Sequence, residues 1–278
     1  MISTDTLELL RATVDDWRRA GESVAIVPTM GNLHDGHLAL LGEAKRKAMR
    51  TVASIFVNPT QFGPGEDYES YPRTREADLA SLESAGCDLV WLPSVERMYP
   101  LDPPFMVQVP DSLSDRLCGA SRPGHFDGVA SVVLRLFNQV RPDVAVFGEK
   151  DYQQLVIIRR MVEDLSLDIR IAGLPTVRES SGLALSSRNA YLDKDERSSA
   201  PVLYRVLTEM ARALRENTDF KALRRASLSR LEAAGFRPDY LEWCSAETLG
   251  PIRAGRPSRL FAAAWLGRAR LIDNVPVD

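Results

Sequence analysis

The chain has 278 residues, of which 45% are hydrophobic and 26% charged, the composition of an ordinary soluble globular protein. Its formal net charge is −3, no apolar run could span a membrane and no signal peptide is apparent, so we expect neither nucleic acid nor a membrane as a partner. The three cysteines form no Cys-x-x-Cys pair, so we expect no disulfide framework and a location in the reducing cytoplasm.

From its N-terminus onward the chain alternates between helical and extended apolar patterns. Apolar residues that recur every three or four positions predict helices over 4–20, 34–49, 74–85, 128–140 and 152–165. Runs rich in β-branched and apolar residues predict strands at 24–27, 51–57, 89–92, 144–147 and 169–172. The stretch 93–123 is less regular, with an extended piece expected at 105–109.

Strands that alternate with helices pair in parallel and are joined by right-handed crossovers. The pattern therefore predicts an α/β fold with a doubly wound, Rossmann-like parallel sheet. Ligands of such sheets bind beyond the carboxyl ends of the strands. The loops that follow Val27, Val57 and Phe147 are therefore expected to converge on one cleft, and polar side chains are concentrated in these loops.

The pattern changes after about Arg188. The sequence from Asp193 to Glu196 is typical of a helix N-terminal capping arrangement. An apolar helical stripe follows over 203–214, a second helix is expected over 220–234, and extended pieces at 240–244, 259–266 and 270–273. We therefore expect two domains, a large one over residues 1–185 and a small α+β C-terminal lid over residues 186–278.

A tight turn joins the first predicted strand to the helix after it. Gly31 and Asn32 can adopt the backbone angles that a sharp turn needs, and Gly36 lets a ligand approach the backbone closely. Unpaired N–H groups at such a helix start form an anion site. His34 and His37 lie three residues apart and share a helix face. The segment indicates a phosphate site or, alternatively, a helix start with two surface histidines.

Three further polar clusters lie in loops. Gln61 carries an amide that both donates and accepts, which suits the hydroxyl and carbonyl groups of a polar substrate. Lys150 brings a mobile positive charge to a strand-to-helix loop whose N–H groups suit a phosphate. Ser186, Ser187 and Arg188 offer two hydroxyls and a guanidinium that can hold phosphate oxygens. Read alone, Gln61 and the serine pair fit solvated loops better than a site, and Lys150 fits an ordinary surface charge at a helix start.

In their full form these segments resemble the pantothenate synthetase (pantoate–β-alanine ligase) family. The resemblance rests on Pro-Thr-Met-Gly-Asn-Leu-His-Asp-Gly-His at 28–37, Asn-Pro-Thr-Gln-Phe at 58–62, Gly-Glu-Lys-Asp-Tyr-Gln-Gln at 148–154 and Ala-Leu-Ser-Ser-Arg-Asn at 184–189. It extends over the strings at 71–74, 122–126 and 264–274. The histidine core is also similar to that of nucleotidylyltransferases and class I aminoacyl-tRNA synthetases.

The resemblance implies a role for each residue that matches a family motif. The implied catalytic residues are His37, His34 and Lys150. Implied ATP contacts are Met30, Gly31, Asn32, Leu33, His34, Asp35, Gly36, His37, Gly148, Glu149, Lys150, Asp151, Val177, Leu185, Ser186, Ser187 and Arg188. Pantoate and β-alanine would be bound by Gln61 and Gln154. The metal ligands stay unassigned, and His125 receives no chemical role.

The implied reaction has two steps. ATP and (R)-pantoate give pantoyl adenylate and pyrophosphate, and β-alanine then displaces AMP to form the amide of pantothenate. ATP is a substrate, Mg²⁺ is the expected metal, and the resemblance implies a homodimer formed through the large domain. Whether His37 transfers a proton or only donates a hydrogen bond stays open, because imidazole suits either role near neutral pH.

Three alternatives are open from the sequence. A nucleotidylyltransferase acting on another phosphate or carboxylate acceptor would release a stable nucleotide product. A regulatory module would bind nucleotide without turnover, although it does not need so many groups around one phosphate. Binding of tRNA, as in the synthetases, is disfavoured by the acidic composition and the lack of an obvious anticodon-binding extension.

Overall fold

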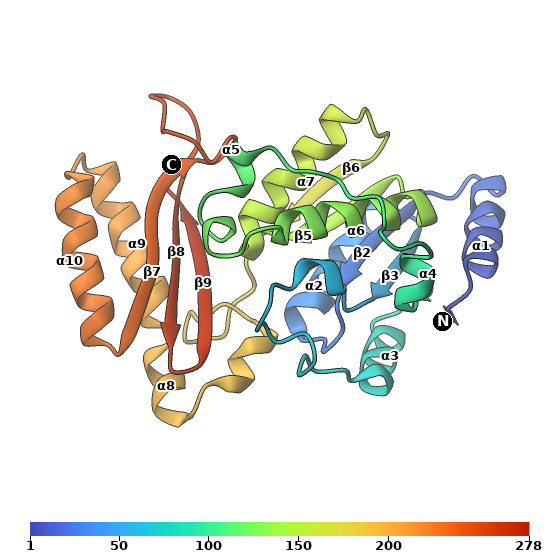
Figure 1. Ribbon diagram of the computed structural model, residues 1–278, viewed down its shortest axis with the longest axis horizontal. Helices are drawn as coiled ribbons and strands as arrows, with labels where there is room; N and C mark the ends of the chain where they lie inside the picture. The colour runs from blue at the N-terminus through green and yellow to red at the C-terminus, as the bar shows by residue number, and fades with distance from the viewer. Residues whose placement is uncertain (278) are drawn as a thin grey trace.

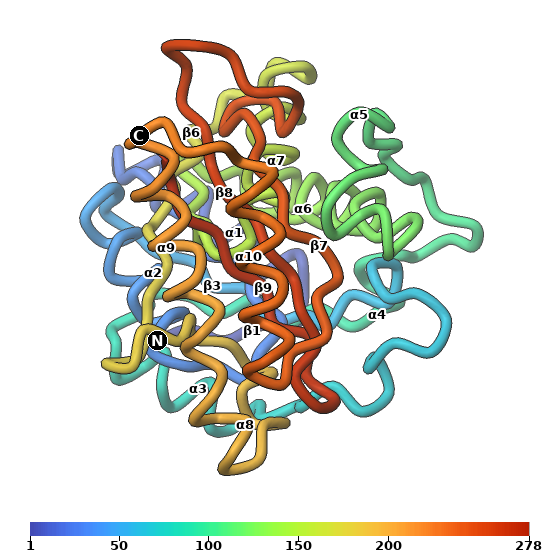
Figure 2. The backbone as a smooth tube through the Cα atoms, turned by 90° about the vertical axis from the view of Figure 1, so that its left-hand side faces the viewer, coloured from blue at the N-terminus to red at the C-terminus, as the bar shows by residue number. Residues whose placement is uncertain are grey.

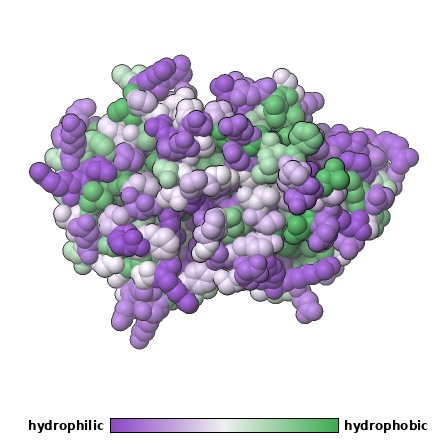
Figure 3. All heavy atoms as spheres, in the orientation of Figure 1, coloured by the Kyte–Doolittle hydropathy of each residue, from purple (hydrophilic) through white to green (hydrophobic). Residues whose placement is uncertain are grey.

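The computed structural model of the chain describes residues 1–277, which fold into two lobes built around two separate sheets (Figure 1). The large lobe contains a six-stranded sheet and the small lobe a three-stranded one. Figure 2 looks onto the small lobe and shows its two long helices in front of its strands. On the face in Figure 3 hydrophilic and hydrophobic residues are intermixed, and the outline is notched between the lobes.

The sheet of the large lobe is entirely parallel. Its strands are β1 (Ile2–Thr4), β2 (Val24–Thr29), β3 (Arg50–Ile55), β4 (Leu89–Trp91), β5 (Val144–Gly148) and β6 (Arg170–Leu174). They are ordered β1-β4-β3-β2-β5-β6, and each neighbouring pair runs in the same direction. The chain order reverses between β2 and β5. In doubly wound sheets this switch point is where the ligand crevice opens.

Helices cover both faces of this sheet. One face packs on α1 (Leu7–Arg19), α6 (His125–Val140) and α7 (Tyr152–Asp164), and the other on α2 (Asp35–Lys47) and α3 (Arg75–Ser84). Successive strand residues point to opposite faces, so Ile26 of β2 packs in the first cluster and Val27 in the second. The doubly wound α/β fold predicted from the sequence is confirmed.

Shorter elements carry the loops of the large lobe. They are the α-helical turns α4 (Val95–Met98) and α5 (Asp111–Ser114) and the 3₁₀ turns η1 (Pro59–Gln61), η2 (Gly119–Ser121) and η3 (Glu149–Asp151). A further 3₁₀ turn, η4 (Ser187–Tyr191), leads into the small lobe. The turns η1 and η3 follow the ends of β3 and β5, where the sequence placed two of its polar clusters.

The small lobe has its own core. It consists of α8 (Lys194–Ser199), α9 (Val202–Arg215), α10 (Phe220–Ala233) and the antiparallel strands β7 (Phe236–Ser245), β8 (Ser258–Leu266) and β9 (Ala269–Pro276). The apolar stripe of α9 packs on the sheet, and Asp193 and Glu196 form the predicted capping box. Gly267 has a positive φ of 53° and closes the turn between β8 and β9. The α+β prediction is confirmed.

Two local predictions were wrong. The first helix was expected from residue 4, but Ile2–Thr4 forms strand β1, too short for its pattern to stand out, and the helix begins at Leu7. No strand forms at 105–109. The N–H groups of Val107 and Val109 instead donate to side chains of α6, to Ser131 Oγ at 2.7 Å and Asp127 Oδ1 at 2.8 Å. These bonds leave the segment no need of a partner strand.

Strand β2, the first strand that the sequence predicted, also runs further than expected. Pro28 was expected to end it, yet β2 continues to Thr29. This is possible because β2 pairs with β5 only through Ala25 and Ile26, so the ring nitrogen costs no ladder bond there. The domain boundary between residues 185 and 186 stays a prediction. Leu183 already packs in the core of the small lobe.

Candidate active site

The predicted convergence of strand-end loops is present as a cleft between the lobes. Two adjoining cavities make it up, one of about 250 Å³ and one of about 490 Å³. The smaller lies over the ends of β2 and β5, and the larger extends towards β8 and β9. Arg122, Lys150, Gln154, Ser186 and Arg188 are among the residues that line both. The two cavities are therefore halves of one site.

The two imidazoles after β2 form a capping box at the start of α2. His34 Nδ1 accepts from the N–H of Gly36 at 3.1 Å, and His37 Nδ1 accepts from the N–H of His34 at 3.3 Å. Their ring centroids lie 4.1 Å apart. A ring nitrogen that accepts carries no proton, so each neutral ring carries its proton on Nε2. Both histidines line the smaller cavity and can donate there.

The surroundings keep both rings neutral. Burial lowers the pKa of His37 to about 3, and the nearby His34 and Lys150 act in the same direction. Burial also lowers the pKa of His34, again assisted by Lys150. Charging either ring would remove an imidazolium from water next to an ammonium group. At neutral pH the pair therefore offers two hydrogen-bond donors and no positive charge.

The turn between β2 and α2 is built around a buried carboxylate from α3. Asp78 is 2% exposed and accepts from the N–H of Asn32 at 3.0 Å and from the N–H of Leu33 at 2.8 Å. Gly31 has a φ of +81°, and a Cβ there would lie 2.9 Å from Asp78 Oδ2. The sequence predicted unpaired N–H groups for a phosphate at this turn. That was wrong for Asn32 and Leu33, whose donors bind Asp78.

Gln61 is held in one orientation by its neighbours. Asn58 is buried and donates from Nδ2 to Gln61 Oε1 at 3.0 Å, and Gln61 Nε2 contacts Met30 Sδ at 3.3 Å. The turn η1 lies so close to α6 that a Cβ at Gly128 would be 2.2 Å from the carbonyl oxygen of Thr60. Glycine at 128 is therefore required for this approach.

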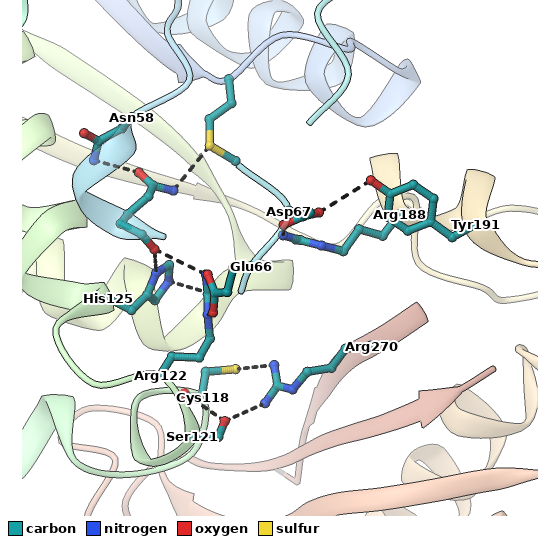
Figure 4. Close-up of polar contacts among 12 residues, drawn as sticks. Asn58, Glu66, Asp67, Cys118, Ser121, Arg122, His125, Arg188, Tyr191 and Arg270 are labelled. Carbon is teal, nitrogen blue, oxygen red and sulfur yellow. Dashed lines mark hydrogen bonds and ion pairs between the residues drawn. The ribbon is translucent and has the colours of Figure 1, made fainter. Parts of the chain in front are cut away.

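His125 uses both ring nitrogens to hold the same loop. Its Nδ1 donates to the carbonyl oxygen of Gln61 at 2.7 Å, and its Nε2 accepts from Arg122 at 2.9 Å, since a guanidinium can only donate. Arg122 also pairs with Glu66 at 2.7 Å (Figure 4). Burial lowers the pKa of His125 to about 4, and Arg122 contributes. The residue to which the sequence assigned no chemistry thus positions the η1 loop.

In the loop after β5, the adjacent residues Glu149 and Lys150 point in different directions. Lys150 faces the cleft, where its Nζ lies 3.8 Å from Asp151 Oδ1. Glu149 points the other way and pairs with Arg259 of β8 at 3.1 Å. The lysine is thus available to a ligand, whereas the adjacent glutamate links the two lobes.

The segment that enters the small lobe brings an arginine into the cleft. Arg188 pairs with Asp67 at 3.1 Å, and the hydroxyl of Tyr191 lies 3.5 Å from the same carboxylate (Figure 4). Ser187 Oγ donates to the carbonyl oxygen of Asn32 at 3.3 Å, which brings the segment against the β2 turn. Ser186, Ser187 and Arg188 therefore line the same cavity as the two histidines, where their hydroxyls and guanidinium can hold an oxyanion.

Most residues named from the sequence meet in this cleft. Those that line one or both cavities are Met30, His34, Gly36, His37, Gln61, Gly148, Lys150, Asp151, Gln154, Val177, Leu185, Ser186, Ser187 and Arg188. The remaining five are not among the lining residues: Gly31, Asn32 and Leu33 wrap Asp78, Asp35 is exposed, and Glu149 pairs with Arg259.

Sequence reasoning missed several residues that shape the site. Asn58 and Arg122 lie in segments that match family motifs, so the family resemblance could have identified them. Asp67 and Asp78 stand in none of them. Asp67 reaches Arg188 across 121 positions of sequence and Asp78 reaches Leu33 across 45. Only the folded chain shows such pairs.

A switch-point cleft with two neutral imidazole donors, a lysine, an arginine and oriented carboxamides defines an α/β protein equipped to bind a phosphate-bearing ligand. The chain belongs to the pantoate-beta-alanine ligase family, whose model matches residues 3–276. The family predicted from the sequence is confirmed.

Close relatives cover nearly the whole chain. It is 54% identical over 278 residues to a pantothenate synthetase of Shewanella amazonensis, covering 99% of each chain. It is 55% identical over 273 residues to one of Alkalilimnicola ehrlichii, covering 97% of this chain and 95% of that protein.

Solved structures of the family share the fold. Pantothenate synthetase of Thermus thermophilus matches with a TM-score of 0.93 at 49% identity, covering 100% of this chain and 99% of that one. A pantoate-beta-alanine ligase of Francisella tularensis, complexed with beta-gamma ATP and beta-alanine, matches with a TM-score of 0.84 at 32% identity, covering 100% and 98%. Within residues 1–277 no helix is both long and apolar enough to cross a membrane.

Proposed function

We propose that this chain joins (R)-pantoate to β-alanine at the expense of ATP, giving pantothenate, AMP and pyrophosphate through a pantoyl adenylate. The observation that carries the proposal is the meeting of His34, His37, Lys150, Gln61 and Arg188 in one cleft of a chain that matches this ligase family over almost its full length. The separate motifs converge although they are far apart in sequence.

In the first step a carboxylate oxygen of pantoate attacks the α-phosphorus of ATP, and the bond to the β-phosphate oxygen breaks with its electrons leaving on pyrophosphate. Two anions must approach, so the site has to offset their repulsion. Lys150 supplies the charge, and the Nε2–H groups of His34 and His37 donate to phosphate oxygens without adding charge. Because His37 is neutral, it acts as a hydrogen-bond donor in this proposal and not as an acid.

Ser186, Ser187 and Arg188 would hold the β- and γ-phosphates and then the departing pyrophosphate. Positioning the two substrates should contribute more than any single charge, since well-oriented intramolecular reactions gain about 7–11 kcal/mol. Val177 and Leu185 line the smaller cavity and would contact the adenosine part of the nucleotide.

In the second step the amine of β-alanine attacks the carbonyl carbon of the adenylate. The bond from that carbon to the phosphate oxygen breaks, AMP leaves with the electrons, and the nitrogen gives up a proton to water to form the amide. Gln61, oriented by Asn58, and Gln154 would hold the pantoyl and β-alanine groups.

Mg²⁺ is part of the proposal. Residues 1–277 contain no group of three or more His, Cys, Asp or Glu side chains that could hold a metal ion. In this proposal the ion is bound mainly by phosphate oxygens of ATP, where it would neutralise charge on the leaving group.

Isotope exchange between pyrophosphate and ATP tests the proposal. With pantoate and Mg²⁺ present and β-alanine absent, we expect exchange that depends on pantoate, because the adenylate forms reversibly. AMP release should then require β-alanine. Failure of both reactions in a protein that binds ATP would contradict the assignment and favour a nucleotidylyltransferase with another acceptor.

We also propose that the chain forms a homodimer through the large lobe. The loop between α4 and α5 exposes Leu101, Phe105 and Met106, and Phe105 is 94% exposed. Such apolar exposure is costly on the surface of a monomer. Light scattering during size exclusion should give twice the chain mass, and Phe105→Ser should weaken the dimer. A wild-type monomer would refute the dimer.

We further propose that the chain works in the cytoplasm. Cys87, Cys118 and Cys244 are free thiols, as a reducing compartment favours.

A further inference from the structure

Strand β9 carries two adjacent polar residues, Asp273 and Asn274, that the proposed reaction does not use. Asp273 and Asn274 are only 5% and 4% exposed, although they lie near the end of the chain. Asp273 forms a bidentate ion pair with Arg178 at 2.7 and 2.8 Å, inside the small lobe and its connecting segment. Asn274 instead faces the large lobe, where it meets the backbone of the loop that carries Lys150.

Every polar group of the Asn274 side chain has a partner. Its Nδ2 donates to the carbonyl oxygens of Glu149 and Lys150, both at 2.9 Å, and its Oδ1 accepts from Arg259. Arg259 is 9% exposed, pairs with Glu149 at 3.1 Å and lies over the ring of Tyr152 at 4.0 Å. Fully satisfied buried networks of this kind are rigid and specify one arrangement.

The network holds the backbone on both sides of the catalytic lysine. The carbonyl groups of Glu149 and Lys150 flank the Cα of Lys150, so fixing both sets the direction in which its side chain leaves the loop. The donors come from the small lobe and the loop from the large lobe. Resting on the proposed function, we propose that Asn274 is a positioning residue that aims Lys150 at the α-phosphate.

The test uses Asn274→Asp, which keeps the shape of the side chain and the acceptor for Arg259 but cannot donate to the two carbonyl groups. Trp243→Phe is the matched control. It removes one side-chain hydrogen bond of the small lobe, from Trp243 Nε1 to Ser258 Oγ at 3.0 Å, and lies outside both cavities. Pantoate-dependent pyrophosphate–ATP exchange is measured for each full-length protein, together with its thermal midpoint.

We expect Asn274→Asp to lower kcat of exchange by about 10-fold or more with KM for ATP changed less than about 3-fold, because a misaimed group loses the transition state and not the ground state. The control should keep the wild-type kcat. If Asn274 had a purely structural role, Asn274→Asp and Trp243→Phe would both lower the thermal midpoint, and Asn274→Asp would not lower kcat selectively over KM. An unchanged kcat in Asn274→Asp would overturn the proposal.

A double-mutant cycle with Lys150→Ala shows whether Asn274 acts through the lysine. If it does, adding Asn274→Asp to Lys150→Ala should change the residual rate by less than about 2-fold, because coupled residues are not additive. Independent multiplication of the two losses would overturn the proposal. If Asn274→Asp does not fold, Asn274→Ala is used, and unfolding of both would make Asn274 a stability residue and also overturn it. A wild-type protein that shows neither exchange nor β-alanine-dependent AMP release would defeat the proposed function itself.

Discussion

The carboxylate of Asp78 makes the sharpest prediction about the β2 turn. It accepts the N–H groups of Asn32 and Leu33 at 3.0 and 2.8 Å and the hydroxyl of Thr74 at 3.1 Å, and it is buried. Each hydrogen bond to a charged group contributes about 1.5–3 kcal/mol, and an abandoned buried donor costs about 1–3 kcal/mol. Allowing for non-additivity, Asp78→Ala should lower the free energy of unfolding by about 3–5 kcal/mol.

Urea unfolding followed by fluorescence measures this loss, and Thr74→Val is the control. That variant removes one donor to Asp78 and leaves both N–H bonds intact, so it should cost only about 1 kcal/mol. The turn also carries His34 and His37, so Asp78→Ala should reduce pyrophosphate exchange even where the variant is folded. A loss of stability below about 1 kcal/mol would refute the view that a buried carboxylate satisfies these donors.

The remaining predictions concern the groups around the turn. Because the pKa of His37 is lowered to about 3, the pH profile of the exchange rate should contain no inflection at pH 6–7 that disappears in His37→Gln. Such an inflection would contradict the role of His37 as a neutral donor. The unfolded state then binds more protons than the folded state between pH 3 and about 6.5, so wild-type stability should rise with pH across that range, less so in His37→Gln. Gly128→Ala would place a Cβ 2.2 Å from the carbonyl oxygen of Thr60, so it should raise KM for pantoate by displacing Gln61, as steady-state kinetics would show. Lys150→Ala should lower adenylation about 100-fold or more, and an exchange rate equal to wild type would remove its proposed role.

The order of strands and helices could be predicted because each depends on patterns within about 15 residues. The apolar, β-branched run at 24–27 and the helical stripe of α9 are visible directly in the sequence. Strand β1 could not be predicted this way, since Ile2–Thr4 is a strand only through pairing with Leu89–Trp91. The segment 105–109 failed for a related reason, because α6 side chains took the bonds that a strand would have needed.

The site divides in the same way. Motif residues such as His34 and Lys150 could be named because their spacing and chemistry are local. The partners that fix their state could not. The proton position on His34 depends on Gly36, which is near in sequence, but the burial that keeps the ring neutral depends on the whole cleft. Asp78 was undetectable in the sequence, because a single aspartate at the start of a helix resembles any surface carboxylate.

The charge balance of the cleft follows from these states. With His34 and His37 neutral, the positive charges that line the smaller cavity are those of Lys150, Arg188 and Arg122. In this structure Lys150 faces the carboxylate of Asp151 and Arg188 that of Asp67. A triphosphate must therefore displace carboxylates from the cations it binds, and the neutral histidines can donate without any such exchange. Two further cations at the end of β2 would repel Lys150, whereas the Nε2–H donors of two half-buried, neutral imidazoles can stabilise the same phosphate oxygens beside it.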